Sequence, residues 1–358
     1  MWLAASEGAR WVGMLVKQAK DVARQWVEAD ATKTPGFQGA YFAGSANWLG
    51  DDAGFPATSD LDVYLVVDGP LPPLKLGKFI YRGVLLEVTY LPRDALRSPE
   101  AVLGSYHLAG GFRTRSIISD PSGALTALRD AVARQYAQRR WVRTRCEQAA
   151  DGVRNYARAL DEAQSLHDQV SSRLFAAGVT THVLLVAGLK NPTVRRRYVA
   201  ARELLAEYGR LGFQEELLAL LGCADMDRRR VERHLAAMAE AFDAAKVAIR
   251  TPYRFGSDIS DSARPIAIDG SRELIERGLH REAVFWIAAT YSRCRTIFAA
   301  DAPELIARFD PRYRELLADL GLGSFADRQR RGEQIVAQLP RVWEIAEAIM
   351  AANPAIED

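Results

Sequence analysis

Cysteine and histidine are scarce in this chain of 358 residues, which has three cysteines and five histidines. Cys146, Cys223 and Cys294 are far apart, odd in number and without a CxxC spacing, so the sequence predicts neither a disulfide framework nor a zinc site. The histidines have no partner pattern. A zinc-dependent or histidine-based nucleophilic mechanism is therefore not expected.

The sequence also has little net charge and no long apolar run. A formal charge of +2 provides no overall field that would attract a polyanion, so any affinity for a nucleotide or a nucleic acid must come from a local patch. No apolar stretch approaches the roughly 20 residues that span a bilayer. The first residues, MWLAASEGAR, lack a basic segment followed by a continuous apolar one. We therefore expect a cytoplasmic protein without a membrane partner.

Strand patterns occur only in the first third of the chain. An amphipathic helix is expected from residue 7 to about 30, followed by a short strand in AYFAG and a longer one in DLDVYLVV. KFIYRGVLLEVTYL then predicts a hairpin that turns at Arg82 and Gly83, and RSIIS one more short strand.

The rest of the chain is rich in Ala, Leu, Arg and Glu and predicts helices, near residues 124–165, 168–189, 193–221, 226–249, 271–301 and 328–352. One long irregular loop is expected between about 251 and 270. The fold class is therefore α+β: a small domain at 1–122 with a mixed sheet and flanking helices, then a larger helical domain at 123–358.

The strand in DLDVYLVV carries two carboxylates where a buried strand should carry few. Residues two apart on a strand face the same side, so Asp60 and Asp62 project together while Leu61 and Val63 face the opposite layer. Two like charges about 6 to 7 Å apart repel each other unless a cation lies between them. A hard divalent cation such as Mg²⁺ suits these oxygen ligands.

Two further features accompany the aspartates. Gly44 and Ser45 follow the first strand and precede ANWL, which we expect to form a helical turn whose backbone N–H groups could bind an anion. Glu87 lies on the second strand of the hairpin, where it alternates with apolar residues. An Asp-x-Asp on a strand edge is often only a solvated face, and a Gly-Ser before a helix is often only a cap.

Taken in order, these features resemble the DNA polymerase β-like nucleotidyltransferase superfamily, in particular its small-molecule branch with the aminoglycoside nucleotidyltransferases. The resemblance covers about residues 8 to 120. It implies that Gly44, Ser45 and Ser59 contact the phosphates of a nucleoside triphosphate, and that Asp60 and Asp62 bind Mg²⁺, with two ions expected. Glu87 would be the third metal ligand or the general base.

The same resemblance implies a basic residue in the helical domain that reaches the triphosphate. Lys190 is the first candidate, with Arg195 and Arg196 after it, although a basic residue at a helix end is also a common structural feature. Arg197 and Arg202 are expected on the solvent face. Asp51 and Asp52 are expected to be solvated loop residues, with a cationic acceptor as the alternative. GSDISD, at residues 256–261, looks like a second Gly-Ser with an acidic pair but lacks a flanking apolar strand, so it is expected to be a loop with helix caps, with a role in the active site as the alternative.

The sequence thus predicts an enzyme that transfers a nucleoside monophosphate, most simply AMP from ATP, to a hydroxyl group of a small acceptor and releases pyrophosphate. Two alternatives stay open: a nucleotidyltransferase that modifies a protein or an RNA, and a nucleotide-binding module of the same fold without turnover. Nucleic acid is not an expected partner, because the Arg-Arg-Asp motif and the strongly basic tail of the tRNA-end-adding relatives are missing. The protein could be a monomer or a homodimer. The acceptor is not identified.

Overall fold

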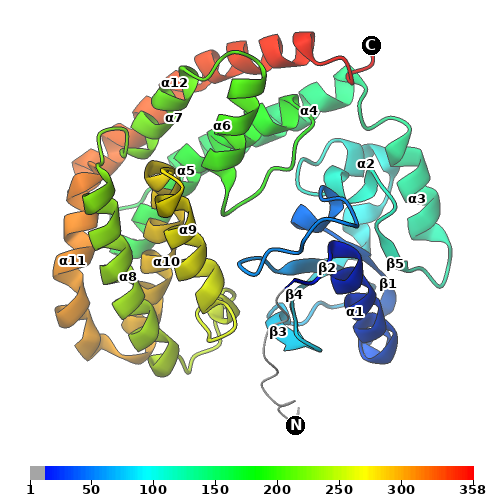
Figure 1. Cartoon of the computed structure of the whole chain (residues 1–358), viewed down its shortest axis with the longest axis horizontal. Coiled ribbons are helices and arrows are strands. Elements are labelled where there is room, and N and C mark those ends of the chain that lie inside the picture. The colour runs from blue at the N-terminus through cyan, green and yellow to red at the C-terminus, as the bar shows by residue number, and fades with distance from the viewer. Residues whose placement is uncertain (1–12) are drawn as a thin grey trace. The chain divides into compact units, whose positions relative to one another are not determined.

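The computed structural model describes residues 13–358, which form two compact units (Figure 1). The first unit consists of the described chain up to Leu103, together with Leu108–Tyr136 and Pro252–Ile266. The second consists of Gly104–His107, Ala137–Thr251 and Ala267–Asp358. The first unit therefore takes one of its segments from a part of the sequence that is surrounded by helices of the second.

A five-stranded mixed sheet forms the centre of the first unit. Its strand order is β3-β4-β2-β1-β5, and β2 and β4 are parallel while the other neighbours are antiparallel. The strands are β1 (Phe37–Phe42), β2 (Leu61–Val67), β3 (Gly77–Tyr81), β4 (Val84–Pro92) and β5 (Ile117–Ser119).

The hairpin between β3 and β4 turns at Arg82 and Gly83, as predicted. Both residues have a positive φ, of 47° and 79°, which matches the two-residue turn that fits the twist of antiparallel strands.

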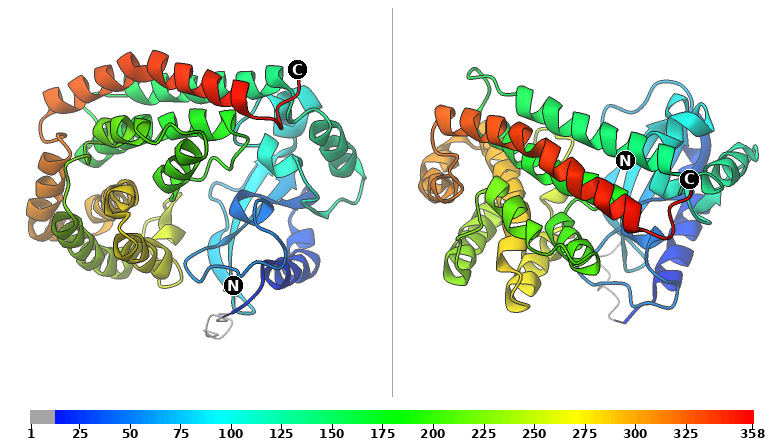
Figure 2. Two further views of the ribbon diagram at one scale, coloured as in Figure 1. Left: turned by 45° about the horizontal axis from the view of Figure 1, so that its top comes forward. Right: turned by 90° about the horizontal axis from the view of Figure 1, so that it is seen from above.

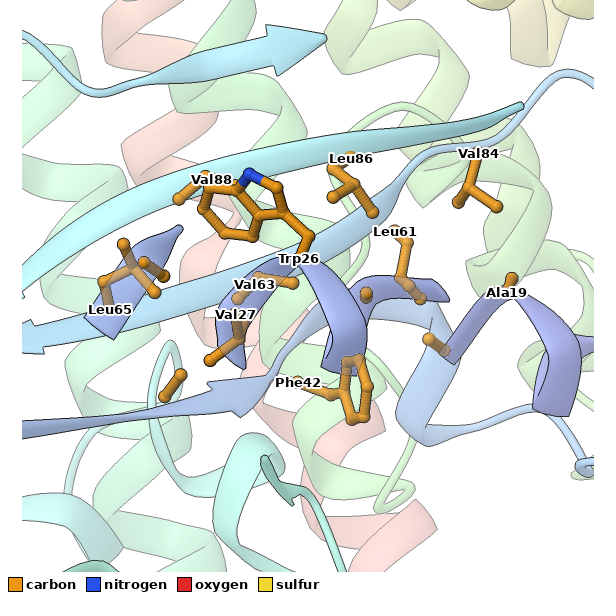
Figure 3. Packing of buried hydrophobic residues seen from close by; sticks show 14 of the residues in the cluster. Ala19, Trp26, Val27, Phe42, Leu61, Val63, Leu65, Val84, Leu86 and Val88 are labelled. Atoms are coloured by element: carbon orange, nitrogen blue, oxygen red, sulfur yellow. The ribbon is translucent and has the colours of Figure 1, made fainter. Parts of the chain in front are cut away.

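Helix α1 (Val16–Ala29) covers one face of this sheet and forms the core of the unit. Trp26 and Val27 lie among the apolar side chains of β2 and β4, including Val63, Leu86 and Val88 (Figure 3). These residues recur at helical spacing on α1 and at alternate positions on the strands, so each element buries one face. The opposite face of β2 and β4 carries Asp62, Tyr64 and Glu87 together with the apolar Val66 and Leu85. The predicted start of this helix at residues 7–12 lies outside the described residues.

The remaining helices of the first unit are α2 (Pro99–Leu103) and α3 (Ala124–Ala133). Short helical turns connect its elements: η1 (Ala31–Lys33), η2 (Gly44–Asn47), η3 (Arg93–Leu96), η4 (Ala109–Phe112) and η5 (Gly256–Asp258).

Helices joined by loops and turns make up the described residues of the second unit. Long helices α4, α5 and α12 pack against one another, and Figure 2 shows α12 lying beside α4. The helices are α4 (Arg139–Arg158), α5 (Leu166–Ala187), α6 (Arg197–Glu207), α7 (Phe213–Leu221), α8 (Arg228–Ala248), α9 (Gly270–Glu276), α10 (His280–Asp301), α11 (Ile306–Asp319) and α12 (Phe325–Ala352), with a one-turn helix η7 (Pro303–Leu305) and a π-helical turn η6 (Pro265–Asp269) before α9.

The α+β class is confirmed, but several predicted helices are divided. The segments 124–165, 193–221 and 271–301 each form two helices, and one break coincides with Gly209, whose φ of 66° is that of a helix-ending glycine. Helix α11 was not predicted. It contains Pro311, a residue that ordinarily ends a helix because it lacks an N–H group and its ring crowds the preceding turn.

By its length and composition, helix α5 could cross a membrane, although no apolar stretch of that length is expected from the sequence. However, 83% of its most apolar window is buried inside the protein. Its side chains contact other helices all round, including α4, α10 and α12. A helix that is apolar on all sides is also what the centre of a large helical unit requires.

Candidate functional site

The parallel pairing of β2 and β4 brings together the three carboxylates singled out from the sequence. Asp62 is in register with Glu87 on the neighbouring strand, and Asp60 lies two residues before Asp62 on the same face. Carboxylate oxygens of all three residues lie within 4.8 Å of one another. This acidic cluster, Asp60, Asp62 and Glu87, could bind a metal ion.

Two lysines that the sequence did not single out lie at the acidic cluster. Lys78 is in register with Glu87 on β3, and its ammonium group donates to Glu87 and lies 3.1 Å from Oδ2 of Asp60. Lys75, just before β3, donates to the other carboxylate oxygen of Glu87. Glu87 thus accepts from two ammonium groups, although only 17% of its side chain is exposed.

A fourth carboxylate comes from the segment Pro252–Ile266. Asp258 is buried and accepts a hydrogen bond of 2.7 Å from Nζ of Lys78. The expectation that GSDISD is a loop with caps is therefore incomplete, because Asp258 belongs to the surroundings of the acidic cluster. The pairing of Asp258 with Lys78 has no local signal in the sequence, since the two residues are 180 positions apart.

The pKa directions follow from how the positive charge is shared. Burial by itself raises the pKa of Asp60, but the nearby Lys78 ammonium outweighs it and the pKa lies below its usual value. Burial lowers the pKa of Lys78, yet the charges of Asp60, Asp258 and Glu87 hold it well above its usual value. Lys78 is therefore a permanent cation at neutral pH.

Asp62 is the carboxylate that this arrangement leaves least compensated. Burial and the negative charges of Asp60 and Glu87 raise its pKa well above the usual value. The same surplus of negative charge reaches Tyr64, two residues further along the same face. Burial, Asp62 and Glu87 together raise the pKa of Tyr64 to about 12.

The net charge of the site could be balanced by one divalent cation. Asp60, Asp62, Glu87 and Asp258 contribute four carboxylates, and Lys75 and Lys78 contribute two ammonium groups. With every group ionised, the surplus is two negative charges. The three residues of the acidic cluster offer only oxygen donors, which hard cations prefer, so the donor set and the charge both fit.

Gly44 lies directly against Asp62. The chain turns at Gly44–Asn47 in one short 3₁₀ turn, so the predicted helical turn forms slightly earlier than expected. Gly44 has a φ of 57°, and a Cβ atom there would overlap Oδ2 of Asp62. The backbone N–H of Ala43 also donates to the carbonyl of Asp62, at 3.0 Å. Only glycine permits both this backbone conformation and this approach.

The other residues predicted to contact phosphate are distributed over both units. Ser45 follows Gly44 in the same turn and is partly exposed. The Ser59 hydroxyl lies 3.3 Å from the carbonyl of Asp60. Lys190, Arg195 and Arg196 lie in the second unit, where the Lys190 ammonium pairs with Glu207 at 2.8 Å.

Arg197 is wrongly predicted to face solvent. Its side chain is 1% exposed, donates to the carbonyl of Val194 and stacks on the rings of Phe175 and Phe285. Burial lowers its pKa to about 10. Arg197 is the first residue of α6 and lies on the side of that helix that packs against α5. Consecutive residues of a helix point to different sides, so an error of one residue in the helix pattern is enough to exchange a buried side chain for an exposed one.

Asp51 and the cysteines have structural surroundings. Asp51 is exposed and pairs with Lys20 of α1 at 2.8 Å, which supports its prediction as a loop residue. The three cysteines are buried, free thiols, and burial raises the pKa of each. They are unreactive in this state, because the thiolate is the nucleophilic form.

A comparison of the chain with models of known protein families finds no match, and a comparison with curated proteins finds no significant match.

Asp60→Asn and Asp62→Asn should change stability in opposite directions in metal-free buffer at neutral pH. Asp62 has a raised pKa, so the folded state binds protons more readily than the unfolded state, and stability falls as pH rises above the usual aspartate range. Removing that charge should raise the urea midpoint. Asp60 has a lowered pKa, so its charge is stabilising, and its loss should lower the midpoint. Equal shifts for the two variants would contradict the unequal compensation.

Gly44→Ala should destabilise the protein by about 1–3 kcal/mol, because the new methyl group would displace the Asp62 carboxylate and strain a left-handed backbone. Urea denaturation measures this effect. Gly50→Ala is the matched control, since a Cβ there meets nothing within 4 Å and should change stability by less than about 0.5 kcal/mol. Equal stability of the two variants would argue against the close approach.

Proposed function

We propose that this protein is a nucleotidyltransferase that transfers a nucleoside monophosphate, AMP from ATP in the simplest case, to a hydroxyl group of a small acceptor. One observation carries the proposal: Asp60, Asp62 and Glu87 converge from β2 and β4 directly beside the turn at Gly44. This is the arrangement that the sequence resemblance to the polymerase β-like nucleotidyltransferases implies. The preference for ATP and for a small acceptor rests on that resemblance alone.

Asp60 and Asp62 would hold Mg²⁺, with two ions in the complex with nucleotide, and Glu87 would be either the third metal ligand or the general base. When bound, the metal supplies a positive charge that polarises the α-phosphoryl group and stabilises the pyrophosphate leaving group.

The backbone at Gly44 and the hydroxyl groups of Ser45 and Ser59 are proposed to contact the phosphates. Ser45 is partly exposed on the turn whose first residue touches Asp62, which supports this role. Lys190, Arg195 and Arg196 of the second unit are proposed to add positive charge to the same triphosphate. The proposal also keeps the expectation that the protein acts in the cytoplasm.

Transfer requires one bond to form and one to break. The acceptor oxygen attacks the α-phosphorus, the bond from that phosphorus to the pyrophosphate oxygen breaks, and pyrophosphate leaves with the electron pair. The acceptor proton passes to a carboxylate, for which Glu87 is the candidate. Lys75 and Lys78 hold both oxygens of Glu87, so this carboxylate is oriented before substrate binds.

Binding of ATP should depend on both the divalent metal ion and the paired aspartates. Isothermal titration of the wild-type protein with ATP should show binding in the presence of Mg²⁺ and much weaker binding with a chelator. The Asp60→Asn/Asp62→Asn double variant should lose the metal-dependent part. Asp51→Asn/Asp52→Asn, which changes two aspartates of a neighbouring loop, is the matched control and should bind as the wild type does. Metal-independent binding, or none, would overturn the proposal.

Glu87→Gln should lower kcat by at least about 10²-fold because it removes the proposed proton acceptor while keeping the shape of the side chain. Release of pyrophosphate from ATP, measured across a panel of hydroxylated compounds, identifies an acceptor and then gives kcat. ATP affinity should change only a few fold if Glu87 is mainly the base, whereas loss of metal-dependent binding would assign it as a metal ligand. Glu28→Gln, an exposed position on α1, is the control. Full turnover by Glu87→Gln would exclude both roles.

A further inference from the structure

The Lys78 ammonium group contacts three of the four carboxylates at the site. Its ammonium group lies 3.1 Å from Oδ2 of Asp60 and 2.7 Å from Oδ1 of Asp258, and it also donates to Glu87. Only 8% of the side chain is exposed. Two of its partners belong to the acidic cluster and one does not, so Lys78 connects the acidic cluster with the segment Pro252–Ile266.

The contact between β3 and this segment is closely fitted. Gly77, the residue before Lys78, has a φ of 77°, and a Cβ atom there would overlap the side chain of Ser257. Phe255 adds a second contact, since the Lys75 ammonium lies 5.6 Å from the centre of its ring. Phe255 and Ser257, which both precede Asp258, thus lie against Lys75 and Gly77 at the start of β3 and place Asp258 beside Lys78.

A lysine ammonium and a metal ion compete when both use the same carboxylate oxygens. Lys78 donates to Glu87 and lies beside Asp60, which are two of the three possible metal ligands. Binding of a divalent cation must weaken these two contacts because like charges repel at short range. Of these three partners, Asp258 is the one outside the acidic cluster, so it could keep its contact with the Lys78 ammonium group when a metal ion binds.

We propose that Lys78 is an internal cation that competes with the divalent metal ion for Asp60 and Glu87, and that Asp258 is a positioning residue that draws Lys78 away from them. The inference rests on the metal centre of the proposed function, and it adds an explanation of what sets the affinity of that centre for the metal ion. Lysine suits this role, because its ammonium group is a point charge on a flexible stem and can move between neighbouring acceptors.

The proposal predicts opposite effects on metal binding for two residues that touch each other. Lys78→Gln removes the competitor and should lower the dissociation constant for Mn²⁺, used as the probe without nucleotide, by at least about fivefold. Asp258→Asn leaves the ammonium group with Asp60 and Glu87 only, and should raise the dissociation constant about as much. A merely structural contact would shift both variants in the same direction, toward weaker binding.

Matched controls separate these effects from charge alone. Asp261→Asn removes an exposed carboxylate from the same segment, and Lys33→Gln removes an exposed lysine outside it; both should bind Mn²⁺ as the wild type does. Lys78→Arg keeps the positive charge and should not gain the tighter binding of Lys78→Gln. Thermal unfolding followed by circular dichroism shows whether each variant is folded.

The outcomes distinguish this inference from the proposed function. A wild-type protein that does not bind Mn²⁺ at all overturns the metal centre and the inference together. Wild-type binding combined with unchanged or weaker binding by folded Lys78→Gln overturns the inference alone. If Asp258→Asn does not fold, the comparison of Lys78→Gln with Lys78→Arg still decides, because equal affinities of these two variants would exclude competition by the lysine charge.

Discussion

The site depends on the repulsion among carboxylates that two neighbouring parallel strands hold close together. Asp60, Asp62 and Glu87 have oxygens within 4.8 Å of one another, a separation that costs free energy unless cations offset it. The protein offsets part of the repulsion itself, through Lys75 and Lys78, while burial and the negative charges of Asp60 and Glu87 still hold the pKa of Asp62 well above its usual value. A site that keeps such a surplus gives up stability and gains affinity for an added cation.

The backbone makes this arrangement possible at two glycines. Gly44 lets the first strand end against the Asp62 carboxylate, and Gly77 lets the segment around Ser257 approach the start of β3. Both have a positive φ, so a side chain would be strained as well as too large. One glycine is part of the motif that the sequence shows. Gly77 belongs to no motif in the sequence, and only its contact with the distant segment around Ser257 explains why a glycine is needed there.

The sequence was sufficient for the parts of the site that follow strand periodicity. Alternation put Asp60 and Asp62 on one face and Glu87 on another strand, and the parallel register of β2 and β4 confirms that the three meet. Lys75, Lys78 and Asp258 could not be found in this way. Lysine on an edge strand is common, and Asp258 lies 180 residues after Lys78, beyond the helices of the other unit at Ala137–Thr251.

The predictions of helix boundaries and of buried helix faces failed for a related physical reason. The break between α3 and α4, at residues 134–138, contains neither glycine nor proline, so the local sequence gives no signal for it. Arg197 shows the same limit for a single side chain: aromatic rings of α5 and α10 and a backbone carbonyl make burial of a guanidinium tolerable there. Local patterns therefore identify what repeats along an element, whereas a cation's place depends on partners that only the folded chain brings together.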